Sequence, residues 1–268
     1  MSGWLGMPVD RRLAAAAFGD DPGRWPLPAA FTPIDTWLRA VAAGGQGQYG
    51  CARSDLTVLR RHVSSGPLAS LAHSTHASLL RQLGGHAVAR GWDGRARALA
   101  ADAQSVVDAL VGLAADALGM MRFAASAALL DRARAALDEA QNPPDRLPIR
   151  LQWVTAELAM GSGDGGAAVR HAERACELAD ASASVRHRVK SDAILAAALC
   201  AAGRVQRARA VADDALLVTE RLGLLPLRWA VASLLADLGS DTMPTDRLRA
   251  IRDECAAELR RRGGVWYR

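Results

Sequence analysis

Residues 191–223 constrain the fold more than any other stretch of the chain. They read SDAILAAALCAAGRVQRARAVADDALLVTERLG, two helical segments separated by a glycine. Small residues stand at fixed offsets: Ala196, then Gly203 after seven residues, Ala208 after five and Ala215 after seven more. Positions seven residues apart lie on one face of a helix, and small side chains there let two antiparallel helices pack closely. The stretch therefore predicts a helical hairpin on which a second hairpin can stack.

The same frame recurs four times upstream. Its small residue in the first helix falls on Ala40, Ala77, Ala114, Ala156 and Ala196. Its turn falls on Gly47, Gly84, Met121, Gly163 and Gly203. Its two contacts in the second helix fall on Ala52, Ala89, Ser126, Ala168 and Ala208, and on Leu59, Ala96, Ala133, Ala175 and Ala215. Successive turns are 37, 37, 42 and 40 residues apart, which predicts about five consecutive hairpins.

This frame resembles the tetratricopeptide repeat family, whose helix-turn-helix unit of about 34 residues carries small residues at these offsets. The resemblance covers residues 33–222, with longer units that lack most of the family's aromatic positions and its closing proline. Residues 79–100, LLRQLGGHAVARGWDGRARALA, are also similar to helical repeat regions of some bacterial transcription regulators. The resemblance implies an all-α, right-handed superhelix of about five antiparallel hairpins with a concave inner face.

Three regions follow from this interpretation. Glycine and proline interrupt residues 1–32, so we expect a mobile N-terminal arm there, with a capping segment on the first repeat as the alternative. Residues 33–223 form the repeats. Residues 224–268 form a C-terminal capping helix pair with an arginine-rich tail, unless the apolar end of the array is covered by a second copy in a homodimer.

The concave face is the first candidate binding site. Residues three before or one after the small position of each first helix are expected to point inward: Trp37, Val41, Ser74, Ser78, Val111, Ala115, Trp153, Glu157, Ala193 and Ala197. With residues near the helix ends, the predicted partner-binding set is Trp37, Arg81, Asp108, Arg150, Trp153, Glu157 and Lys190. Indole rings with guanidinium groups suit a protein or peptide partner. The alternative is that both tryptophans pack between helices.

The C-terminus is a second candidate site. Positive charge gathers at Arg260, Arg261, Arg262 and Arg268. It predicts a docking patch for an anionic partner such as RNA, the ribosome or an acidic protein. The alternative is an ordinary solvated helix end, because acidic residues of the same helix dilute the charge.

Several other classes of site are not expected. His73 and His76 are three residues apart, but no HExxH motif accompanies them, so we predict no metal. There is no GxSxG motif, and the glycine clusters lack the lysine of a phosphate loop. Four widely spaced cysteines without a CxxC pair are read as reduced thiols. We therefore expect no cofactor and no catalytic activity.

Three functions remain in the sequence interpretation. The favoured one is a cytoplasmic, non-catalytic scaffold or adaptor that binds a protein or peptide, with no membrane segment, since no run approaches about 20 apolar residues. The second is a ligand- or peptide-sensing module of a transcriptional regulatory system. The third is an RNA- or ribosome-associated factor that docks through its C-terminus.

Overall fold

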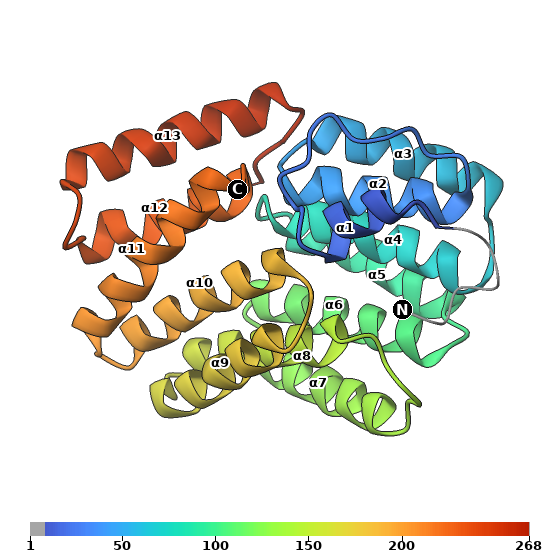
Figure 1. Cartoon of the computed structure of the whole chain (residues 1–268). Coiled ribbons are helices and arrows are strands. Elements are labelled where there is room, and N and C mark those ends of the chain that lie inside the picture. The colour runs from blue at the N-terminus through green and yellow to red at the C-terminus, as the bar shows by residue number, and fades with distance from the viewer. Residues whose placement is uncertain (1–8, 268) are drawn as a thin grey trace.

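The computed structural model describes residues 9–267, which form thirteen α-helices and no strand (Figure 1). The helices are α1 (Arg11–Phe18), α2 (Pro33–Gly45), α3 (Tyr49–His62), α4 (Gly66–Arg81), α5 (His86–Leu99), α6 (Ala103–Gly119), α7 (Phe123–Asp138), α8 (Arg146–Gly161), α9 (Gly165–Asp180), α10 (Val185–Ala201), α11 (Val205–Arg221), α12 (Leu225–Leu238) and α13 (Thr245–Arg261). The predicted all-α class is confirmed for these residues. No helix among them is long and apolar enough to cross a membrane.

Local signals set the ends of these helices. Asp102 caps α6 by accepting from the backbone N–H of Ser105, and Thr32 caps α2 just ahead of Pro33. All five turn positions of the frame have positive φ, from 61° at Met121 to 84° at Gly84, a conformation that glycine adopts without strain. Helix α8 begins at Arg146, so Pro148 lies in its first turn, where proline is tolerated.

Successive helices pack as antiparallel pairs, from α2–α3 to α12–α13, and each pair contacts the next. The fifteen small or apolar positions of the frame are all buried, at 2 % exposure or less. In the third pair the serine of the frame remains satisfied, because Ser126 Oγ donates to the Ala114 carbonyl oxygen at 2.9 Å. The seams between helices are therefore dry and close-packed.

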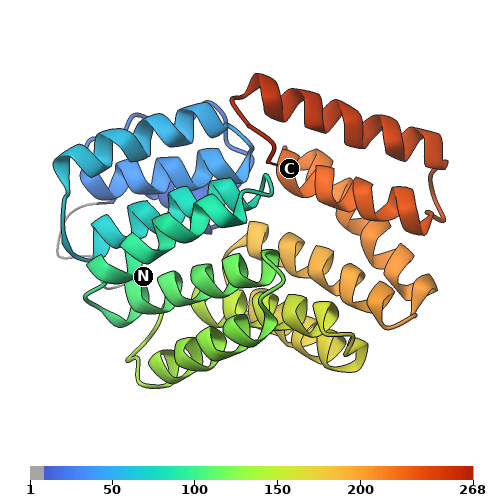
Figure 2. The ribbon, with the colours of Figure 1, turned by 180° about the vertical axis from the view of Figure 1, so that it is seen from behind.

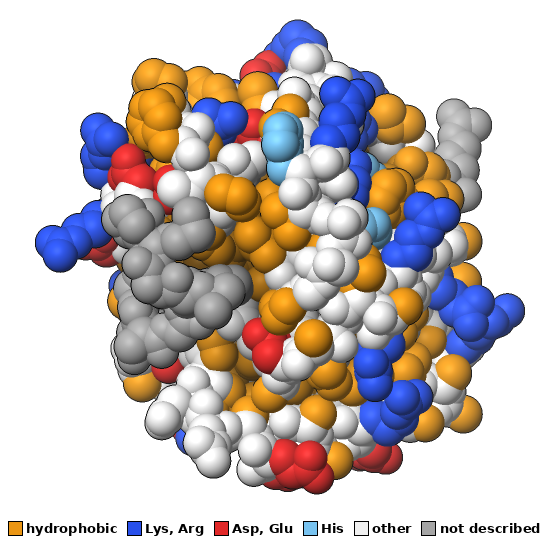
Figure 3. Space-filling view, turned by 90° about the vertical axis from the view of Figure 1, so that its right-hand side faces the viewer, with side chains coloured by type: hydrophobic (Ala, Val, Ile, Leu, Met, Phe, Trp, Pro, Cys, Tyr) orange, Lys and Arg blue, Asp and Glu red, His pale blue; other side chains and the backbone are white. Residues whose placement is uncertain are grey.

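The pairs follow one another around a central space (Figures 1 and 2). The first helix of each pair faces this space, and the second helix lies outside. The side seen at the right of Figure 1, where α3 to α5 lie, is shown as a surface in Figure 3, with arginine side chains standing out from it. The chain thus builds an inner layer of helices surrounded by an outer one.

The helix pairs form a ring, and both ends of the described chain contact parts of this ring that are distant in sequence. At the C-terminal end, Gly50 N–H donates to the Arg262 carbonyl oxygen at 2.8 Å, and Tyr267 N–H donates to that of Leu83 at 2.9 Å. The Trp266 ring lies 4.5 Å from that of Trp229, centroid to centroid. These hydrogen bonds join the C-terminal end of the described chain to α3 and to the turn after α4. The last helix pair is thereby connected to the first two pairs.

The described part of the predicted N-terminal arm, residues 9–32, packs against two helices. Leu13 and its neighbours on α1 are buried against α2. The carbonyl oxygen of Ala17 accepts from Arg186 Nη2 at 2.9 Å, and that of Gly19 accepts from Val185 N–H at 3.1 Å. This segment therefore connects α2 with α10. Residues 1–8 of the predicted arm lie outside the described residues.

A substitution in the seam tests the close packing. Ala196 has no exposed surface, so Ala196→Leu inserts volume where none is free and should lower the free energy of unfolding by about 1–3 kcal/mol. The control is Ala125→Leu, at an exposed position of α7, which should change it by no more than about 0.5 kcal/mol. Urea denaturation measures both. Equal effects of the two variants would show that the seam is not close-packed.

Candidate functional site

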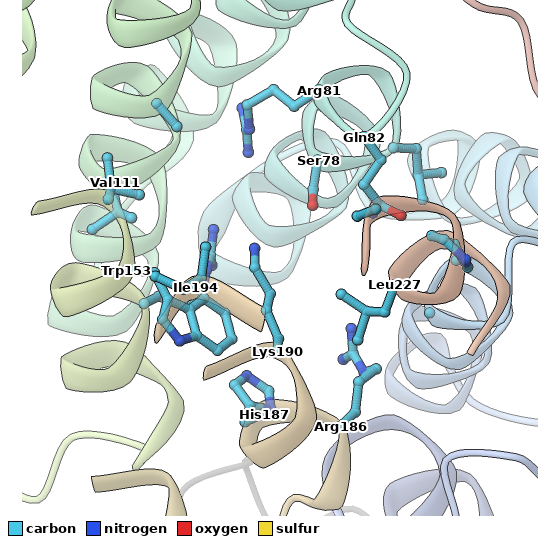
Figure 4. A pocket seen from close by; sticks show the side chains of 18 of the residues that line it. Ser78, Arg81, Gln82, Val111, Trp153, Arg186, His187, Lys190, Ile194 and Leu227 are labelled. Carbon is cyan, nitrogen blue, oxygen red and sulfur yellow. The ribbon is translucent and has the colours of Figure 1, made fainter. Parts of the chain in front are cut away.

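A cavity of about 640 Å³ occupies the centre of the ring (Figure 4). Its wall comes from the first helix of every pair, together with Phe18 of α1, Gln82 in the turn after α4, and His86 at the start of α5. All seven residues of the sequence-predicted binding set line it, as do all ten positions expected to point inward. The structure thus brings together residues that are up to 153 positions apart in the sequence, from Trp37 to Lys190.

The lining is rich in positive charge. Its cationic side chains are Arg81, Arg146, Arg150, Arg186 and Lys190, and its acidic ones are Asp108 and Glu157. The sequence analysis missed Arg146 and Arg186. Helical spacing could have revealed them, because each lies four residues before a predicted lining residue and so shares its helix face.

Asp108 on α6 holds two of these arginines. Its side chain is buried, with Oδ2 2.5 Å from Arg146 Nη2 and Oδ1 bonded to Arg150 Nη1. Burial by itself would raise the pKa of the Asp108 carboxyl, but the charges of Arg146 and Arg150 outweigh it and hold the pKa below its usual value. One carboxylate thus forms ion pairs with two guanidinium groups, so one of the two positive charges is not compensated.

Around Arg81 the balance of charge is reversed, because carboxylates outnumber guanidinium groups. Its guanidinium bonds to Asp93 and, at 3.0 Å, to Asp116, and both carboxylates are buried. Burial raises the pKa of Asp116 to about 7, opposed by the charge of Arg81 and reinforced by that of Asp93. Two acids therefore share one cation, and Arg81 is fully compensated within the protein.

Lys190 and Arg186 lie next to each other along one face of α10 (Figure 4). Lys190 Nζ is 4.4 Å from the centroid of the Trp153 ring; burial lowers its pKa, and the charge of Glu157 opposes this shift. Burial, together with the charges of Arg150 and Arg146, lowers the pKa of Arg186 to about 10. No carboxylate among the described residues forms an ion pair with Arg186, so its charge is uncompensated.

Both predicted tryptophans are part of the wall and are largely buried. Trp37 is 3 % and Trp153 6 % exposed. The indole N–H of Trp37 donates to Thr75 Oγ1 at 2.9 Å, and that of Trp153 donates to Ser191 Oγ at 2.8 Å. These bonds hold each ring between neighbouring helices, where it packs and lines the cavity at once.

The predicted C-terminal patch lies away from the cavity. Arg261 and Arg262 both pair with Glu258, at 2.5 and 2.6 Å, and Arg262 also donates to the Gln46 carbonyl oxygen at 3.1 Å. Arg260 is exposed, and Arg268 lies outside the described residues. Two arginines of the patch are thus engaged within the protein.

The paired histidines belong to an aromatic cluster. The rings of His76 and His73 lie 4.1 and 5.5 Å from that of Trp92, centroid to centroid. Within residues 9–267, no three histidine, cysteine or acidic side chains are grouped as a metal site would require.

Comparison with protein-family models finds no match for this chain, and comparison with curated proteins finds none either.

Removing the Asp108 carboxylate should destabilise the fold. Asp108→Asn leaves the guanidinium groups of Arg146 and Arg150 without their shared counter-charge, and breaking a buried ion pair in this way costs about 3–5 kcal/mol. The control is Asp131→Asn, which removes an exposed partner of Arg134 and should leave the free energy of unfolding nearly unchanged. A D108N protein as stable as the wild type would refute the buried ion pairs.

Asp116 should make stability depend on pH. Because its pKa is about 7 in the folded protein and near 3.8 when unfolded, the folded state binds more protons between these values. The free energy of unfolding contributed by this group therefore falls as pH rises from about 4 to 7.

The variant Asp116→Asn should remove that fall, because Asp93 then faces Arg81 one to one. Urea denaturation at a series of pH values measures it, with Asp131→Asn as the surface control. A wild-type and a D116N profile that run parallel over this range would contradict the raised pKa of Asp116.

Proposed function

We propose that this protein is a non-catalytic sensing module, a tetratricopeptide-like right-handed superhelix that binds a small anionic ligand in its central cavity. A short peptide with a free carboxylate is our first candidate for the ligand. Of the functions that the sequence suggests, this is the ligand-sensing one.

The excess of cationic over acidic side chains in the cavity carries this proposal. Arg186 has no acidic partner, and Arg146 and Arg150 share Asp108. Like charges that lie close together repel one another, so a bound anion would lower the free energy of this arrangement. Guanidinium groups also bind carboxylates and phosphates through paired hydrogen bonds.

The closure of the ring favours a small ligand over a folded partner. The C-terminal tail joins α13 to α3 and α4, and the N-terminal segment joins α2 to α10. The volume of about 640 Å³ lies within the range of roughly 300–1,000 Å³ typical of small-molecule sites. A scaffold that holds a protein on its concave face needs that face open, which makes it the weaker alternative.

The wall supplies apolar surface beside the charge. Trp153 stacks on His187 with 5.2 Å between ring centroids, and Trp229, Leu227 and Ile194 line the same space. A ligand with one anionic group and an apolar body matches this combination. These residues come from three consecutive inner helices, α8, α10 and α12, so a ligand that contacts them would favour the arrangement in which these helices lie together.

A thermal-shift assay with pooled tetrapeptides that carry free carboxylates tests the proposal. A bound peptide at about 100 times its dissociation constant should stabilise the wild type by about 2.7 kcal/mol. Lys190→Met keeps the length of the side chain but removes its charge from the cavity, and should weaken binding at least tenfold. The control Arg204→Gln, on the exposed turn between α10 and α11, should bind as the wild type does.

Two results would overturn the proposal. One is a wild-type melting temperature that no peptide of the pool raises. The other is equal affinity of the K190M and wild-type proteins for a peptide that does bind.

A further inference from the structure

Positive charge is unevenly distributed along the chain. Residues 36–101 contain eight arginines and two acids, a net charge of +6, whereas the whole chain has a net charge of +5. Both acids, Asp55 and Asp93, are buried and form ion pairs with Arg39 and Arg81. The outside of this region therefore has arginines and no exposed acidic side chain to balance them.

The other six arginines lie on the two outer helices α3 and α5. We call them the basic face: Arg53, Arg60, Arg61, Arg90, Arg95 and Arg97. Figure 3 shows this side of the molecule, where arginine and histidine side chains gather at the upper right of the view without acidic ones among them. Arg61, Arg90 and Arg95 are exposed and make no ion pair with a described residue.

Trp92 of α5 joins the two helices of the basic face. The guanidinium carbon of Arg60, from α3, lies 4.8 Å from the centroid of its ring, and that of Arg95 lies 5.7 Å away. Arg60 Nη1 also lies 3.5 Å from His76 Nδ1. Stacking on the ring limits the freedom of both guanidinium groups, so less entropy is lost when they bind a ligand.

The pKa of His76 reflects the positive charge at this surface. Burial, together with the charges of Arg60, Arg53 and His73, lowers the pKa of His76 to about 4. At neutral pH the imidazole is therefore uncharged, and arginine alone provides the charge of the face.

We propose that the basic face docks the phosphate backbone of a nucleic-acid duplex. The charge of the face complements a regular row of phosphates, and each of its helices, with 14 residues, spans about 21 Å, or about six base pairs. Single strands are usually held by stacking bases on aromatic rings. Here His73, His76, Arg60 and Arg95 already surround Trp92, which favours a duplex.

This docking does not depend on the ligand of the cavity, because no residue of the basic face lines the cavity. It also lies on different helices from the C-terminal arginines. Since the face offers charge without base-reading geometry, binding is independent of sequence.

Fluorescence anisotropy with a labelled DNA duplex of about 20 base pairs tests the proposal at a series of salt concentrations from about 50 mM. The variant Arg61→Ala/Arg90→Ala/Arg95→Ala removes three exposed charges of the face. It should weaken binding at least tenfold at low salt and reduce the slope of log affinity against log salt by about 2.7. The matched control Arg247→Ala/Arg249→Ala/Arg260→Ala removes three charges from α13 and should stay within about twofold of the wild type.

Four results would overturn the proposal. They are no binding of the duplex at low salt, an equal loss in the α13 control, tighter binding of a single strand of the same length, and equal binding of polyglutamate. The last would assign the face to an acidic protein. Circular dichroism confirms that both triple variants keep the wild-type helix content.

Discussion

Close contact between helices through small side chains is the constraint on which the rest of the structure depends. Each pair meets along positions such as Ala114 and Ser126, which have no exposed surface. Because these seams need no long side chains, the larger residues of the inner helices are free to point the other way, into the centre of the ring. The seams thus determine both how the helices stack and which residues line the cavity.

Positive charge is concentrated in the cavity, and this lowers the free energy of unfolding. Asp108 compensates part of the charge of Arg146 and Arg150, and two acids compensate Arg81. Arg186 has a carbonyl oxygen of α1 as its hydrogen-bond acceptor and no carboxylate. Uncompensated buried charge lowers stability, and natural proteins retain such groups mainly where they bind or react with something. This is why we place the function in the centre of the ring.

The two surfaces proposed to bind other molecules use positive charge in different ways. In the cavity, cations lie among apolar rings and a few acids, an environment that suits the proposed small anionic ligand. On the basic face the arginines lie on two helices, α3 and α5, that have no exposed acid, which suits a long polyanion. Both share the first two helix pairs, since Arg81 of α4 lines the cavity while α3 and α5 lie outside it.

Local patterns in the sequence predicted the helices of the repeats, the five turns and the inward positions, because each depends on residues within about two helical turns. They did not predict α1, which lies in the segment expected to be a mobile arm. The positive φ at Gly47 and Met121 and the burial of Ala196 follow from spacing alone. Tertiary structure decided how the ring closes and how its charges are shared. The hydrogen bond from Arg53 to the Gly263 carbonyl oxygen joins residues 210 positions apart. Arg81 forms an ion pair with Asp116, which lies on another helix pair. No periodicity encodes such contacts, since they depend on the summed rotation of every pair between them.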